Sequence, residues 1–112
     1  MAVTTQFENP GVPISFSYGL VASQTTQAGS SSVPSARNVF TSVPSGTSVT
    51  MDSPGLPEEV VIINRGGNTL TVFPPTGWSF NNGTVNASVS INNGSALTFI
   101  SGDPNESSWW TR

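Results

Sequence analysis

The stretch E-V-V-I-I-N-R-G-G-N-T-L-T-V-F, residues 59–73, decides the fold class. Two apolar runs, 60–63 and 70–73, flank a polar segment. The branched Val and Ile side chains suit a pleated strand, and Gly66 and Gly67 allow the positive φ that a tight reversal requires. The stretch therefore predicts a β-hairpin. Four successive apolar residues in the first strand indicate that both its faces are covered, which predicts a central position in a sheet.

Short apolar or alternating segments recur along the rest of the chain, separated by Gly, Asn and Pro turns. No window shows a helical period. This pattern predicts one all-β domain, an antiparallel β-sandwich or jelly-roll-like barrel. The predicted strands are 38–43, 47–51, 60–63, 70–73, 78–80, 85–91, 96–100 and 108–111. The predicted core residues are Val61, Ile63, Leu70, Val72, Val89, Ile91 and Phe99.

The N-terminal third differs from the rest, because its apolar residues are sparse and Ser23–Ser35 is nearly all small or polar. Such a segment buries too little apolar surface to order itself. We therefore divide the chain into an extended N-terminal arm, 1–35, ordered by contact, and a β-sandwich domain, 36–112. Within the arm, Ile14, Phe16 and Tyr18 alternate with other residues and predict a short strand. A disordered leader or a long surface loop is the alternative.

The surface is predicted to be polar but weakly charged. Only 8% of the 112 residues are charged, and the formal net charge is −3, whereas ordinary domains have about 25% charged residues. Few long charged side chains means little side-chain entropy to lose on contact. This favours a chain covered by other protein, although an extracellular β domain with a Thr/Asn-rich surface fits equally well. The start lacks a signal-peptide pattern and no stretch is long enough for a membrane span, so we expect synthesis in a cytoplasm and no membrane partner.

Residues that carry chemistry are mostly missing. The chain has no His, Cys or Lys, which removes the usual base for nucleophilic catalysis and the usual zinc ligands. We therefore expect no enzyme activity and no cofactor, and read Glu58 and Glu59 as solvated carboxylates. Three arginines cannot form a basic patch for nucleic acid. Asp103, Asn105 and Glu106 resemble half a calcium loop, but a plain turn is the favoured interpretation. Four Asn-X-Ser/Thr sequons are interpreted as by-products of turns.

Three tryptophans remain, Trp78, Trp109 and Trp110. They could form a sugar-binding platform. Neighbours in a strand point to opposite faces, so Trp109 and Trp110 are expected to divide between the core and an interface or solvent. We favour this division between core and interface over a sugar-binding platform.

Residues 60–112 resemble a C-terminal pattern of small virion proteins from tailed bacteriophages. The pattern has an apolar strand with an N-x-G-x-N turn, a V-[FY]-P-x-[ST]-G element, an Asn/Gly/Ala-rich segment, a T-F-I/V strand and a terminal W-[WY]. Here it reads V-V-I-I-N-R-G-G-N-T-L-T-V-F-P-P-T-G-W-S-F-N-N-G, then A-S-V-S-I-N-N-G-S-A-L-T-F-I, then S-W-W-T-R. A short stand-alone chain of this kind looks most like a capsid decoration (cement) protein.

The resemblance implies a non-enzymatic protein on the outer capsid surface of the virion, which stabilises the head through its β domain and arm. Its expected partners are the major capsid protein and itself, as a dimer or trimer. Because interfaces concentrate their energy in a few aromatic and apolar anchors, we expect the partner contacts at Phe7, Ile14, Phe16, Tyr18 and Trp110. The alternative is a receptor- or glycan-binding module of a phage tail fibre or baseplate.

Overall fold

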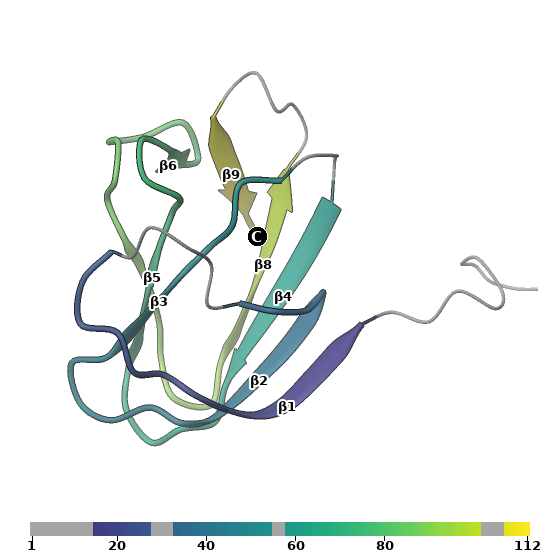
Figure 1. Ribbon diagram of the computed structural model, residues 1–112, viewed down its shortest axis with the longest axis vertical. Coiled ribbons are helices and arrows are strands. Elements are labelled where there is room, and N and C mark those ends of the chain that lie inside the picture. The colour runs from purple at the N-terminus through teal and green to yellow at the C-terminus, as the bar shows by residue number, and fades with distance from the viewer. Residues whose placement is uncertain (1–14, 28–32, 55–57, 102–106) are drawn as a thin grey trace, which may run out of the picture.

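The computed structural model describes residues 15–27, 33–54, 58–101 and 107–112, which form nine short strands (Figure 1). This part of the chain has strands and turns but no helix, which confirms the predicted all-β class. It accordingly holds no helix long and apolar enough to cross a membrane. The strands are β1 (Phe16–Val21), β2 (Arg37–Ser42), β3 (Ser48–Thr50), β4 (Glu58–Asn64), β5 (Leu70–Phe73), β6 (Ser79–Phe80), β7 (Val89–Ile91), β8 (Ala96–Ser101) and β9 (Ser108–Thr111).

The strands form two mixed sheets. The larger sheet has the order β1-β2-β4-β8-β9-β6, and the smaller has the order β3-β5-β7; Figure 1 shows β1, β2, β4 and β8 side by side. The pairs β1–β2, β2–β4, β3–β5 and β6–β9 are parallel. The predicted antiparallel arrangement is wrong for these pairs. The cause is the path of the chain, which crosses between the sheets at every step from β2 to β8, so that alternate strands become neighbours.

Residues 59–73 span both sheets, and residues 64–68 form an arch between them, so the predicted hairpin is wrong. β4 pairs with β2 and β8, whereas β5 pairs with β3 and β7. The arch lies directly on the preceding connection, since the N–H of Val43 donates to the carbonyl of Gly66 at 3.2 Å. A Cβ on Gly66 would lie 2.4 Å from the backbone nitrogen of Val43. Gly66 therefore permits this arch to stack closely on the connection between β2 and β3, a second arch that contains Val43. Gly67 supplies a positive φ of 99°.

The side chain of Asn64, which is fully buried, fixes this arch. Its amide nitrogen donates to the carbonyls of Asn68 and Ile91 at 2.8 and 2.9 Å. Its Oδ1 accepts from the N–H of Gly66 at 2.9 Å. A buried polar group is stable only when it is hydrogen-bonded. These bonds join the end of β4 to the arch and to β7 of the other sheet, so one side chain holds both sheets at this corner.

The core lies between the sheets and draws side chains from both. Leu70, Val72, Ile91 and Phe99 are buried as predicted, and Val89 is partly buried against the core. The prediction is wrong for Val61 and Ile63, which are half-buried on the opposite face of β4. Four consecutive apolar residues cannot fix a register of period two. The core residues are Ala22, Phe40, Val43, Val49, Met51, Val60, Ile62, Leu70, Val72, Phe80, Ile91, Phe99 and Trp109.

β4 occupies the central position predicted from its apolar run, between β2 and β8. Trp109 is 1% exposed in the core and Trp110 is 39% exposed. The expected division of these two tryptophans between core and surface is therefore confirmed. Trp78 is partly buried and packs against the core.

The described part of the expected arm belongs to the sheet. β1 pairs in parallel with β2, the N–H of Ala22 donates to the carbonyl of Ser42 at 3.0 Å, and Ala22 is 1% exposed in the core. The expectation that residues 1–35 reach away from the domain is therefore wrong for residues 15–27. Backbone pairing needs no dense run of apolar residues, so the composition gave no sign of it. Residues 1–14 and 28–32 lie outside the described residues.

Candidate functional site

The candidate site is the outer face of the larger sheet, meaning the face that points away from the smaller sheet. Cross-strand partners share a face. Val60 and Ile62 point into the core, so Glu59, Val61 and Ile63 point outward. The register carries this face to both neighbours of β4, because Ile63 pairs with Val39 of β2 and Glu59 pairs with Ile100 of β8.

Three of the predicted contact residues lie on this outer face. Tyr18 pairs with Val39 and Phe16 pairs with Arg37 at one side of the sheet, while Trp110 pairs with Ile100 at the other. Phe16 and Tyr18 are 60% and 62% exposed. β2, β4 and β8 separate β1 from β9, so these two strands lie about 19 Å apart across the sheet at the usual ~4.8 Å strand spacing. The register places Trp110 level with Glu59, two residues along β4 from the level of Phe16 and four from that of Tyr18. Phe7 and Ile14, the other two predicted contact residues, lie outside the described residues.

Four apolar residues of the outer face, Val39, Val61, Ile63 and Ile100, lie between these aromatic residues and are called the apolar strip. Polar partners stand beside two of them, since Thr98 pairs with Val61 and Glu59 pairs with Ile100. Val39 is buried although it lies outside the core cluster, because its register neighbours Tyr18 and Ile63 flank it. Val61, Ile63 and Ile100 are half-buried on the same face. Sequence reasoning missed all four strip residues as candidate contacts. The run 60–63 did carry the signal, because it indicated that both faces of β4 are covered.

Charged groups on the outer face are few and lie along the strand ends. Arg112 donates to Oε2 of Glu59 at 2.5 Å, with both side chains substantially exposed. An exposed pair of this kind contributes little to stability, roughly 0–1 kcal/mol. Arg37 beside Phe16 is the other charged group that the register places here. The face is therefore apolar at its centre with a thin charged rim, the anatomy of a protein-binding surface.

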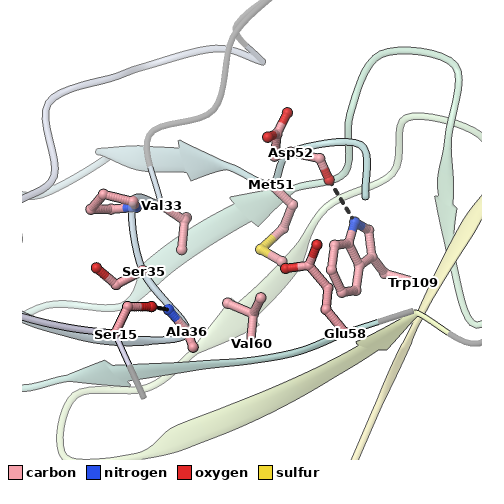
Figure 2. Close-up of a pocket in the computed structure, with 10 residues that line it drawn as sticks. Ser15, Val33, Ser35, Ala36, Met51, Asp52, Glu58, Val60 and Trp109 are labelled. Atoms are coloured by element: carbon pink, nitrogen blue, oxygen red, sulfur yellow. Dashed lines mark hydrogen bonds between the residues drawn. The ribbon is translucent and has the colours of Figure 1, made fainter. Parts of the chain in front are cut away.

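A pocket of about 220 Å³ is the second candidate site, and Figure 2 shows it. Met51, Glu58 and Trp109 point into it from different parts of the chain. The indole N–H of Trp109 donates to the backbone carbonyl of Asp52 at 2.9 Å, which fixes one wall. This volume is below the roughly 300–1,000 Å³ of ordinary ligand pockets.

The pocket has one perturbed group. Partial burial, followed by the nearby negative charge of Asp52, raises the pKa of the Glu58 carboxyl above its ordinary value. A carboxyl group acts as a general acid or base only when it lies within hydrogen-bond reach of the reacting group of a substrate. Within the described ranges, no three or more His, Cys, Asp or Glu residues gather into a possible metal site. Asp103, Asn105 and Glu106, the residues considered for calcium, lie outside those ranges.

The outer face is thus the stronger candidate, because it extends over β1, β2, β4, β8 and β9 and combines exposed aromatic residues with the apolar strip. No family model matches this chain, and no curated protein or solved structure matches it either.

Proposed function

We propose that the protein is a non-enzymatic capsid decoration protein of a tailed bacteriophage, which binds the outer capsid surface through the outer face of its larger sheet. The observation that carries this proposal is the apolar strip of that face, ending in Phe16 and Tyr18 on β1 and in Trp110 on β9. Apolar patches larger than about a few hundred Å² are uncommon on monomeric proteins and mark interaction surfaces. The resemblance of residues 60–112 to small virion proteins supports the capsid as the target.

The proposal includes the finer architecture. The two sheets share one core, and we infer a β-sandwich that sits on the major capsid protein. Residues 1–14, with Phe7 and Ile14, act as the arm that reaches a neighbouring capsid subunit. Two modest contacts joined by a short linker act at high effective concentration. The protein associates with itself as a dimer or trimer at a local symmetry axis, and it is made in the bacterial cytoplasm before it joins the virion.

The binding is expected to be apolar rather than electrostatic. Phe16 and Tyr18 each expose more than half of their side chains, and burying a further ~100 Å² of aromatic surface contributes roughly 2–3 kcal/mol. Salt screens charges and leaves such contacts intact. Stabilisation of the head then follows from linkage, because a protein that binds the assembled shell and not its dissociated subunits shifts the equilibrium toward the shell.

The alternative role in glycan binding receives less support from the tryptophans. A platform needs several exposed rings, but Trp109 lies in the core and Trp78 packs against it. Among the three, Trp110 alone is exposed, and it lies at the end of the apolar strip. The decoration role uses Trp110 together with the strip.

Co-sedimentation with undecorated heads tests the proposal. Tyr18→Ala and Trp110→Ala are compared with Val85→Ala, a matched control, because Val85 is 56% exposed but lies in the connection between β6 and β7. We expect each outer-face variant to lose at least tenfold in affinity, and the control to bind like the wild type at both low and high salt. Equal binding by all three variants would refute the outer-face contact. Binding of the wild type to host cells or glycans, and not to heads, would favour the fibre module.

Removing residues 1–14 tests the arm separately. β1 begins at Phe16, so this deletion leaves all the described strands in place. We expect the shortened protein to fold with an unchanged circular dichroism spectrum but to sediment poorly with heads. Full binding by the shortened protein would remove the arm from the account and leave the outer-face contact standing.

A further inference from the structure

β1 differs from the other edge strands of the two sheets. Exposed edges are usually kept short, charged, interrupted by proline or covered, because their free N–H and C=O groups pair with other strands. Among the described strands, the edges β6, β3 and β7 have two, three and three residues. β3 also carries a bridge between Ser48 and Gln24. β1 has six residues, F-S-Y-G-L-V, with no charge and no proline.

In the regular segment of this edge, before Gly19, the outward-facing backbone groups belong to the two exposed aromatic residues. The carbonyl of Ser15 accepts from the N–H of Arg37 at 3.1 Å, so Ser15 faces β2. In a parallel ladder, alternate residues direct their backbone groups to opposite sides. Ser17 therefore faces β2 as well, while Phe16 and Tyr18 direct their N–H and C=O groups to the open edge. The irregularity between Tyr18 and Leu20, where Gly19 has a φ of 82°, ends this regular segment.

We propose that β1 pairs antiparallel with β1 of a second copy of this chain, about a two-fold axis that passes at Ser17. Phe16 of one copy then lies opposite Tyr18 of the other, and each such pair exchanges both backbone hydrogen bonds. The segment is self-complementary because its two outward-bonding residues are two positions apart, as an isologous contact requires. The contact is also free of like-charge repulsion, although the chain carries a net charge of −3.

This pairing joins two larger sheets into one and places both outer faces on the same side. Phe16 and Tyr18 of the two copies form a cluster of four aromatic rings at the junction, where cross-strand aromatic pairs are favourable. The inference deepens the proposed self-association and rests on it for its partner, since it selects a dimer and names the strand. A target then meets two coplanar faces, which raises the avidity of binding.

The area of the contact sets its strength. Two rings about 60% exposed offer roughly 200–300 Å² per copy, on the usual 150–250 Å² for a buried aromatic side chain. Stable interfaces bury about 800 Å² per partner. The free dimer is therefore weak and concentration-dependent, and docking of both faces on one target strengthens it.

Cross-linking through a single cysteine tests the geometry. The chain has no cysteine, and the proposed axis places Ser17 opposite Ser17 of the second copy as a non-hydrogen-bonded pair. The Cα atoms of such a pair are ~4.5 Å apart, within the range of about 4.4–6.8 Å for disulfides. We expect full-length Ser17→Cys to form a disulfide dimer under mild oxidation at least tenfold faster than Ser45→Cys, an exposed control in the turn after β2, and faster as concentration rises.

A second substitution separates strand pairing from chance collision. Tyr18→Pro in the Ser17→Cys background removes the N–H that faces the open edge and spares the β1–β2 ladder. We expect it to abolish the fast cross-linking, whereas Tyr18→Ala in that background retains more of it because the N–H remains. Thermal melting confirms that each variant is folded, and only folded variants are compared.

Three results would overturn the proposal. Ser17→Cys could cross-link no faster than Ser45→Cys, or its fast reaction could survive Tyr18→Pro. Fast cross-linking that appears only after residues 1–14 are removed would show that this segment covers the edge in place of a second copy. All these measurements use free protein, so a failure here is distinct from a failure to bind heads.

Discussion

Replacing Gly66 with alanine tests the stacked arches most sharply. A Cβ at this position would lie 2.4 Å from both N and Cγ2 of Val43 and 2.7 Å from its Cβ. Two of these three atoms are fixed by the backbone, so the arches must separate. Overpacking of this kind costs about 1–3 kcal/mol, and loss of the hydrogen bond from Val43 to the Gly66 carbonyl adds about 1 kcal/mol. We therefore expect Gly66→Ala to lower the free energy of unfolding by about 2–4 kcal/mol.

The neighbouring glycine supplies the control. Gly67 has a φ of 99°, but a Cβ there would meet nothing within 4 Å. Gly67→Ala should therefore lower the free energy of unfolding only by the strain of a left-handed alanine, roughly 1–2 kcal/mol. Urea denaturation followed by tryptophan fluorescence gives both values. If residues 59–73 formed a hairpin, Gly67→Ala would be the more destabilising substitution, because only Gly67 has a positive φ. If Gly66→Ala is no more destabilising than Gly67→Ala, the stacking of the arches is wrong.

Three further predictions concern the core, the corner and the pocket. Ile62→Ala should cost ~2–5 kcal/mol and Ile63→Ala less than half of that, and equal midpoints in urea would contradict the register of β4. Asn64→Ala should cost about 1–3 kcal/mol because it leaves buried partners unpaired, and hydrogen exchange should show the loss at the arch. The raised pKa of Glu58 means that the folded state holds its proton to higher pH than the unfolded state, so this group lowers stability at neutral pH and the penalty fades as pH falls toward the ordinary glutamate pKa. Glu58→Gln should therefore melt higher than the wild type at pH 7, with a difference that shrinks on acidification; a difference that grows on acidification would contradict this sign.

The sequence predicted the class of the fold and most of its strands. The β-branched runs and the Gly/Asn/Pro turns locate strand segments, and alternation assigns Leu70, Val72 and Ile91 to the core. Turn residues show where the chain reverses, but not whether it returns to the same sheet. That choice depends on what each strand meets in space, which is why residues 64–68 were predicted as a hairpin turn and form an arch.

The candidate site was predicted in part. Phe16 and Tyr18 were predicted as contacts because aromatic residues dominate interfaces, and Trp110 because neighbours in a strand point to opposite faces. The structure exposes all three, and their role in binding stays a prediction. That they share one face depends on the order β1-β2-β4-β8-β9, which pairs strands far apart in the chain. The apolar strip at Val39 and Val61 follows from the same pairing and from the register of β4. No local pattern carries that information.

Quantifying the copies of this protein in purified virions tests the central claim most directly. A decoration protein occupies repeated sites over the whole shell, so a stained gel of purified particles should show it at hundreds of copies, in a fixed small ratio to the major capsid protein. The same band should stay with heads after tails are removed. A few to tens of copies that separate with the tails, or no band at all, would contradict the account.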